Sequence, residues 1–129
     1  MQINDLFLSP FKPGGRDASG YDCFGLFQEL CRRRGTPVPE QGEVAYTELG
    51  ADREAEIVGL APVFGWVPID APEPGCGVAF RIAGWVSHMG MVLDDGVSFI
   101  HTNEKTGVIK SRLDDPMWVK RIAGFYRHV

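Results

Sequence analysis

The stretch of sequence that decides the fold runs from Gly20 to Gly35 and reads GYDCFGLFQELCRRRG. Asp22 is a good N-cap, because an aspartate before a helix can accept a backbone N–H of the first turn. Gly35 is a good stop, since glycine readily takes the left-handed conformation just past a helix end. Apolar residues recur at helical spacing between these two positions. The pattern predicts a helix that has Cys23 in its first turn and ends near Arg34.

Cys23 would lie where backbone N–H groups and the helix dipole stabilise a thiolate, the reactive form of cysteine. That position suits a nucleophile, but a free cysteine is more often a small buried apolar residue. Cys31 falls on the apolar stripe late in the helix, and we assign it to the core. Cys76 lies in a Pro-Gly turn with no obvious activator. Position alone therefore favours the interpretation of Cys23 as a buried apolar residue.

The remaining sequence predicts one α+β domain that spans residues 1–129. Residues 1–20 read as a loop, residues 44–60 as a second helix, and residues 61–77 as a linker with a short strand near Trp66. Five short β-prone segments follow, over residues 78–82, 88–93, 98–102, 108–113 and 124–129. This order predicts N-terminal helices packed on an antiparallel sheet of about 5–6 strands.

Two histidines fall on neighbouring predicted strands. Asp94-Asp95-Gly96, which separates the strands of His88 and His101, is a hairpin signal. If both rings point to one face, His101 can accept the N–H of His88 and orient it, as in a catalytic triad. The alternative is two unrelated polar residues on an exposed sheet face, and spacing alone does not decide between them. His128, next to the C-terminus, is assigned to the surface.

Composition argues against several classes of function. Thirteen Lys and Arg against seventeen Asp and Glu give a formal net charge of −4, whereas non-specific nucleic-acid binding needs a basic surface. The N-terminus does not resemble a signal peptide, and no apolar stretch is long enough to span a membrane, so we expect synthesis in the cytoplasm. Three cysteines without a C-x-x-C pair predict neither a disulfide framework nor a metal site, and nothing suggests an organic cofactor.

Three segments of the chain together resemble the NlpC/P60 family of cysteine peptidases. They are PFKPGG at 10–15 with GYDCFGL at 20–26, PGCGVAF at 74–80, and SHMGMVLDDG at 87–96 with FIH at 99–101. The family motifs to which they are similar read P-Y-x-W-G-G … G-F-D-C-S-G-L, P-G-D-L-V-F-F, and S-H-V-G-I-Y-x-G-x-G … F-I-H. The segments occur in family order and together involve most of the chain.

The resemblance implies a papain-like fold with Cys23 as nucleophile, His88 as general base and His101 as the residue that orients it. Family members cut the peptide stems of the bacterial cell wall, typically after γ-D-glutamate. Asp22 and Ser87 match positions that flank the catalytic pair, and the resemblance implies that they help to hold the amino group of the substrate.

Several residues depart from the family motifs and are expected to alter the substrate cleft. Phe11, which we also assign to substrate binding, replaces a family tyrosine and lacks its hydroxyl. Pro13 stands in place of a tryptophan, Phe24 in place of a serine, and Cys76 in place of an aspartate.

The N-terminal loop further resembles short phage and prophage tail forms of the family, which read G-R-D-x-x-G-x-D-C, then W or F, then G-L. This implies a peptidoglycan endopeptidase carried by a virion tail, with tail proteins as partners and the cell wall as its place of action. Two alternatives remain open at this stage. One is a cell-wall amidase toxin injected into rival bacteria, and the other is a structural module of the tail tip with a dormant site.

Overall fold

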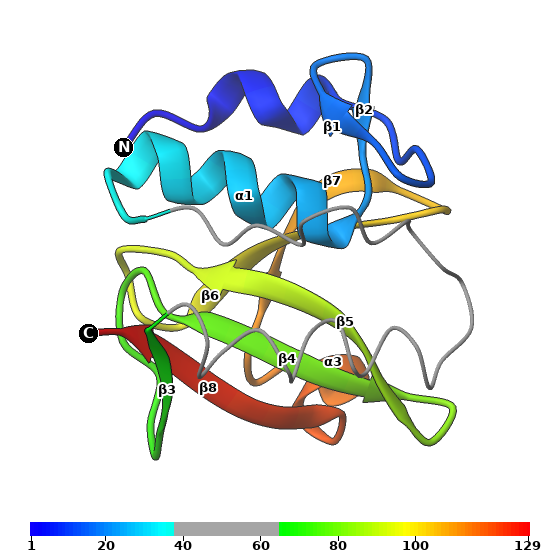
Figure 1. The fold of residues 1–129 in the computed structure, drawn as a ribbon. Coiled ribbons are helices and arrows are strands. Elements are labelled where there is room, and N and C mark those ends of the chain that lie inside the picture. Colours follow the sequence, from blue (N-terminus) through cyan, green and yellow to red (C-terminus); the bar gives the residue numbers. More distant parts are fainter. Residues whose placement is uncertain (38–64) are drawn as a thin grey trace.

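The computed structural model describes residues 1–37 and 65–129, which form a large antiparallel sheet with a helix across it and a small two-stranded sheet (Figure 1). The predicted helix over 44–60 lies outside the described residues. The elements, in chain order, are the 3-10 helix η1 (Asn4–Leu8), β1 (Arg16–Asp17), β2 (Gly20–Tyr21), α1 (Cys23–Arg34), β3 (Trp66–Ile69), β4 (Gly77–Ile82), β5 (Trp85–Val92), β6 (Ser98–Asn103), β7 (Gly107–Arg112), α3 (Pro116–Val119) and β8 (Ile122–His128).

Both predicted ends of helix α1 are confirmed. The Asp22 carboxylate accepts the backbone N–H of Gly25 at 2.7 Å, so the N-cap is made as the sequence suggests. Gly35 takes φ 76° and donates its N–H to the Arg32 carbonyl, while Thr36 donates to the Cys31 carbonyl at 3.0 Å. These bonds satisfy backbone groups that a helix end otherwise leaves without partners.

The large sheet has six strands in the order β3-β8-β4-β5-β6-β7, which confirms the predicted α+β class and strand number. Every paired neighbour is antiparallel. Strand β5 begins at Trp85, earlier than predicted, because Ala83 and Gly84 both take positive φ and make a tight turn directly after β4. The last strand, β8, returns to lie between β3 and β4.

Alternate residues of the sheet belong to two separate apolar clusters. The first cluster joins Leu26 and Leu30 of α1 to Met91 and Ile100 of the sheet. The second contains Phe80, Phe99 and Trp118, the last of which is on the short helix α3. Phe99 and Ile100 are consecutive in β6 and therefore point to opposite faces.

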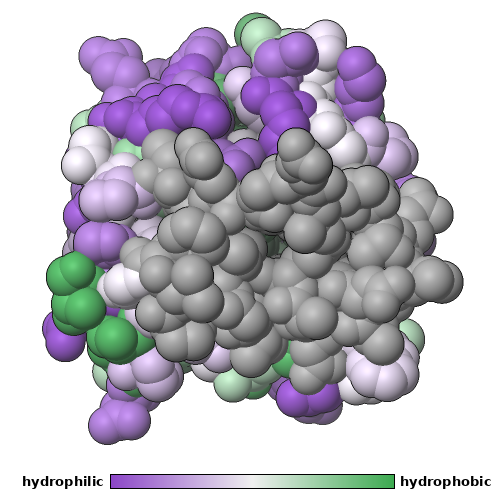
Figure 2. Space-filling model, in the orientation of Figure 1, coloured by the Kyte–Doolittle hydropathy of each residue, from purple (hydrophilic) through white to green (hydrophobic). Residues whose placement is uncertain are grey.

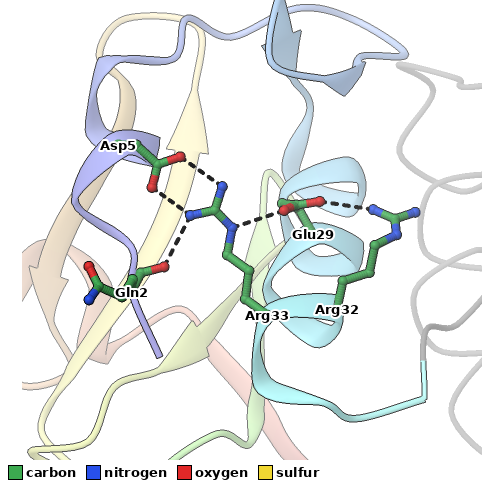
Figure 3. A network of polar contacts seen from close by, with 5 residues as sticks. All are labelled: Gln2, Asp5, Glu29, Arg32 and Arg33. Carbon is green, nitrogen blue, oxygen red and sulfur yellow. Dashed lines mark hydrogen bonds and ion pairs between the residues drawn. The ribbon is translucent and has the colours of Figure 1, made fainter.

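The N-terminal segment differs from the predicted loop, because residues 1–20 contain helix η1 and the small β1–β2 hairpin. Arg33 connects η1 to α1 (Figure 3). Its guanidinium donates to both carboxylate oxygens of Asp5, at 2.6 and 2.8 Å, and to Glu29 at 2.9 Å. Composition alone suggested a loop, whereas bidentate ion pairing and a buried Leu6 favour an ordered turn of helix.

The N-terminal segment also covers the edge of the sheet. Strand β7 lies at that edge, and the Val108 N–H donates to the Ser9 carbonyl at 3.2 Å. Hydrophilic residues gather along the top of the face shown in Figure 2, over the region of η1 and α1. No helix within residues 1–37 and 65–129 is both long and apolar enough to cross a membrane.

Candidate active site

The two histidines singled out from the sequence are in direct contact. His88 Nε2 and His101 Nδ1 lie 2.7 Å apart, which is a hydrogen-bond distance between neighbouring strands β5 and β6. His88 is 6% exposed and His101 is fully buried. The interpretation as unrelated residues on an exposed sheet face is therefore wrong for this pair.

A bulge in β5 sets the direction of His88. The register passes from Phe80 opposite His88 to Arg81 opposite Val86, so Ser87 is an extra residue in β5. Val86 and His88 would share a face in a regular strand, because side chains alternate with a period of two. With the bulge, Val86 joins the cluster under α1, while His88 packs against Phe80 of the second cluster. Bulges of this kind commonly re-aim a side chain beside an active site.

His101 is held in a dry environment. Burial lowers the pKa of His101 to about 4, so its ring is neutral near neutral pH. Its second ring nitrogen, Nε2, lies 2.8 Å from the hydroxyl oxygen of Ser111 on β7. Gly90 leaves room for this ring, since a Cβ there would lie 3.2 Å from the Cβ of His101 and 2.7 Å from the Ile100 carbonyl oxygen.

Trp118 encloses the histidine pair from helix α3. Its ring stacks on His88 with centroids 5.3 Å apart and an interplanar angle of 24°, and it meets His101 edge-on at 4.8 Å. The rings of Phe80 and Phe99 also contact the ring of Trp118, with centroids 5.2 and 5.9 Å away. Such a box of aromatic rings restricts both imidazoles to few orientations and keeps water from their contact.

Cys23 is the first residue of α1, and α1 packs against β5 and β6, the strands that carry the two histidines. The other cysteines are poor nucleophiles. Burial raises the pKa of Cys31 to about 12, and burial also raises the pKa of Cys76. The three cysteines form no disulfide. Cys23 is also buried, at 4% exposed, but it is the one of the three that stands at a helix start, where the helix dipole favours a thiolate.

The loop before Cys23 is closely packed. Asp22 is fully buried, and its Oδ1 accepts hydrogen bonds from the Gly25 N–H and, at 2.6 Å, from the Arg16 guanidinium. A Cβ at Gly25 would collide with the Gly15 carbonyl oxygen, so glycine is required for this close approach. The packing explains why a residue of low helix propensity stands in the first turn.

A family assignment follows from comparison with known sequences. The sequence profile of the NlpC/P60 family matches residues 9–127. The chain belongs to the NlpC/P60 family. A comparison with curated protein sequences found no match.

Solved structures of NlpC/P60 proteins share the fold of this domain. An NLP/P60-family protein from Staphylococcus aureus, described as similar to lipoprotein, superposes with a TM-score of 0.63 at 19% identity and covers 98% of this chain and 38% of its own. A Bacillus cereus NlpC/P60 protein superposes with a TM-score of 0.64 at 22% identity, and the match covers 99% of this chain and 40% of that protein. The NlpC/p60 domain of the peptidoglycan hydrolase SagA superposes with a TM-score of 0.62 at 17% identity, and the match covers 98% of this chain and 92% of that domain. The chain spans about two fifths of the length of the first two proteins.

Ser87 and Phe11, two of the expected substrate-binding residues of this NlpC/P60 domain, lie in different parts of the fold. Ser87 is the half-buried bulge residue next to His88. Phe11 is half-buried and forms an isolated bridge with Tyr21 of β2. Two departures from the family motifs fall in the core, since Phe24 is 1% exposed and Cys76 is 2% exposed. These two substitutions change packing more directly than they change an open cleft.

Sequence reasoning did not place Trp118 or Ser111 in the site. A signal for Trp118 was present, because Asp115-Pro116 is an N-cap followed by proline at the first helical position, which predicts a short helix. Ser111 gave no signal, since its role depends on the register between β6 and β7. Within the described residues, no three His, Cys, Asp or Glu side chains are placed to hold a metal ion.

Asp22 can be tested as a structural cap against its expected role at the substrate amino group. Asp22→Ala is expected to lower the free energy of unfolding by about 2 kcal/mol, because the helix loses its cap. Asp22→Asn keeps a capping oxygen and should lose less stability. Urea unfolding gives both values, and steady-state kinetics gives KM. A raised KM for Asp22→Asn with wild-type stability would instead support the substrate role.

Proposed function

We propose that this NlpC/P60 domain is a cysteine peptidase that hydrolyses the stem peptides of bacterial peptidoglycan, after γ-D-glutamate. Cys23 is the proposed nucleophile, His88 the general base, and His101 the residue that orients His88. The observation that carries the proposal is the buried 2.7 Å contact between His88 Nε2 and His101 Nδ1, on two strands against which a helix that begins at a cysteine packs. SagA, whose NlpC/p60 domain shares the fold, is a peptidoglycan hydrolase.

The contact between the histidines assigns the two nitrogens of His88 different tasks. Nε2 is engaged with His101, so Nδ1 is the atom proposed to accept the proton of the Cys23 thiol. The thiolate sulfur then attacks the carbonyl carbon of the stem peptide, and the carbonyl electrons move to oxygen. The backbone N–H of Cys23 is the expected donor to that oxyanion, because it lies at a helix start.

Two further steps complete the reaction. The tetrahedral intermediate collapses, the C–N bond breaks, and the imidazolium of His88 gives its proton to the leaving amine. Water, deprotonated by His88, then attacks the thioester carbon and releases the new carboxyl group, after which the Cys23 thiol is restored. Each turnover therefore consumes one water molecule and splits one amide.

The finer proposal is that the domain acts from a phage or prophage tail on the cell wall. Its support is the motif of the N-terminal loop, GRDASGYDCFGL at 15–26, which resembles the tail-associated forms. Copurification of tail proteins with the virion-borne domain would support this setting. An adjacent immunity gene would instead favour an injected toxin that cuts the same wall.

Mass spectrometry of digested muropeptides tests the reaction. We expect the wild-type protein to convert a purified stem peptide into two fragments that together contain one added water, with the new carboxyl group on the D-glutamate. Release of the intact stem peptide from the glycan would contradict endopeptidase action and indicate an amidase. Unchanged muropeptides after incubation of folded protein would favour the structural module with a dormant site.

A further inference from the structure

The hydrogen-bonded chain of the site does not stop at His101. Ser111 Oγ lies 2.8 Å from His101 Nε2, on the side of the ring away from His88. His101 is fully buried. Within the described residues, Ser111 is the side chain that lies within hydrogen-bond distance of His101 Nε2. The three side chains come from three successive strands, β5, β6 and β7. Ser111 is thus placed to influence His88 through His101.

One proton lies between His88 Nε2 and His101 Nδ1. Which of these two nitrogens carries it decides whether His88 Nδ1 can accept the thiol proton. If neutral His101 carries its proton on Nδ1, that atom donates to His88 Nε2, and neutral His88 must then carry its own proton on Nδ1. A protonated Nδ1 cannot accept the thiol proton. If His101 carries its proton on Nε2, its Nδ1 accepts from His88 Nε2–H, and His88 Nδ1 keeps its lone pair.

Ser111 can stabilise the second arrangement. In that arrangement the buried His101 Nε2–H needs an acceptor, because an N–H buried without one is destabilising. The Ser111 oxygen is at the right distance to accept, at 2.8 Å. Ser111 is itself half-buried, so its own hydroxyl proton can be directed toward solvent.

We propose that Ser111 is a positioning residue that holds His101 in the tautomer protonated on Nε2, and so keeps His88 Nδ1 basic. The hydrogen-bonded order is His88 Nε2–H to His101 Nδ1, then His101 Nε2–H to Ser111 Oγ. The catalytic part of this inference rests on the proposed function, whereas the tautomer itself is a property of the folded chain. Trp118 supports the same geometry, because it contacts both rings and limits their rotation.

Ser111→Thr and Ser111→Val form a matched pair that tests the proposal. Both side chains are β-branched, suit a strand and have nearly the same volume, but only threonine keeps the hydroxyl. Ser111→Val is expected to lower kcat on muropeptides about 10- to 100-fold with little change in KM. Ser111→Thr should stay near the wild-type kcat. Equal kcat values for the two variants would overturn the catalytic part of the inference.

Nitrogen-15 NMR of histidine-labelled protein reads the tautomer without substrate. The chain has three histidines, and a His128→Gln variant helps to assign the signals. We expect His101 to show a protonated Nε2 in wild type and Ser111→Thr, and a shift toward protonated Nδ1 in Ser111→Val. An unchanged tautomer in a folded Ser111→Val protein would overturn the proposal.

The two measurements separate this inference from the proposed function. If the tautomer shifts as expected but no variant cuts muropeptides, the proton arrangement stands and the peptidase proposal fails. If wild type cuts muropeptides but Ser111→Val matches Ser111→Thr in kcat and in tautomer, the peptidase proposal stands and the role of Ser111 fails.

Discussion

Cys23→Ala is expected to reduce turnover of purified muropeptides by at least about 10⁴-fold, because removal of the nucleophile eliminates the acyl-enzyme route. Stability should change little, since alanine fills most of the space of a buried cysteine. The measurement is the initial rate of stem-peptide cleavage by the folded variant. A Cys23→Ala protein that cleaves as fast as wild type would end the peptidase proposal.

The other two cysteines provide matched controls. Cys31→Ala and Cys76→Ala remove a buried thiol of the same size, and both are expected to keep most of the wild-type rate. Their pKa values are raised by burial, so iodoacetamide near neutral pH should modify Cys23 first. Peptide mapping of the alkylated protein identifies the modified residue. Preferential labelling of Cys31 or Cys76 would contradict the assignment of Cys23.

Trp118→Ala is expected to lower the free energy of unfolding by about 3–5 kcal/mol, the usual range for removal of a large aromatic ring from a core. Trp118 is 8% exposed, and its ring touches Phe80, Phe99 and both histidines of the candidate site. A small domain has only about 5–15 kcal/mol of stability in total, so this loss is large. Urea unfolding monitored by circular dichroism gives the value.

Two further variants, Met117→Ala and Trp118→Phe, separate the effect of Trp118 on stability from its effect on activity. Met117→Ala alters the adjacent residue of α3, which is 60% exposed, and should change stability by less than about 0.5 kcal/mol. Trp118→Phe should retain part of the stability but, in folded protein, lower kcat because the stack on His88 is lost. Wild-type kcat in Trp118→Phe would show that the stack does not position His88.

Local signals explain which parts of the fold were predictable. The ends of α1 depend on Asp22 and Gly35, whose capping chemistry acts within a few residues, and both ends are confirmed. The β5–β6 hairpin depends on the turn at 94–96 and was predicted for the same reason. The return of β8 between β3 and β4 was not predicted, because long-range pairing is chosen by packing of the whole sheet.

The candidate site likewise has parts that local sequence signals predict and parts that they do not. The contact of His88 with His101 follows from two strands joined by a short hairpin, so sequence spacing could suggest it. The bulge at Ser87 has no signature in the residue types around it, and it appears only when the register of β4 and β5 is known. Trp118 reaches the histidines across more than a dozen residues of chain, so local patterns carry no sign of its stacking.

The bulge at Ser87 has a consequence for how this gene can vary. Replacing Ser87 by another residue keeps the length of β5, so Val86 and His88 stay on opposite faces of the sheet. Deleting Ser87 would make Val86 and His88 direct neighbours, which regular alternation also places on opposite faces, so the bulge would be lost without a change in the direction of either side chain. The direction of His88 is therefore expected to survive both substitution of Ser87 and a single-codon deletion at that position.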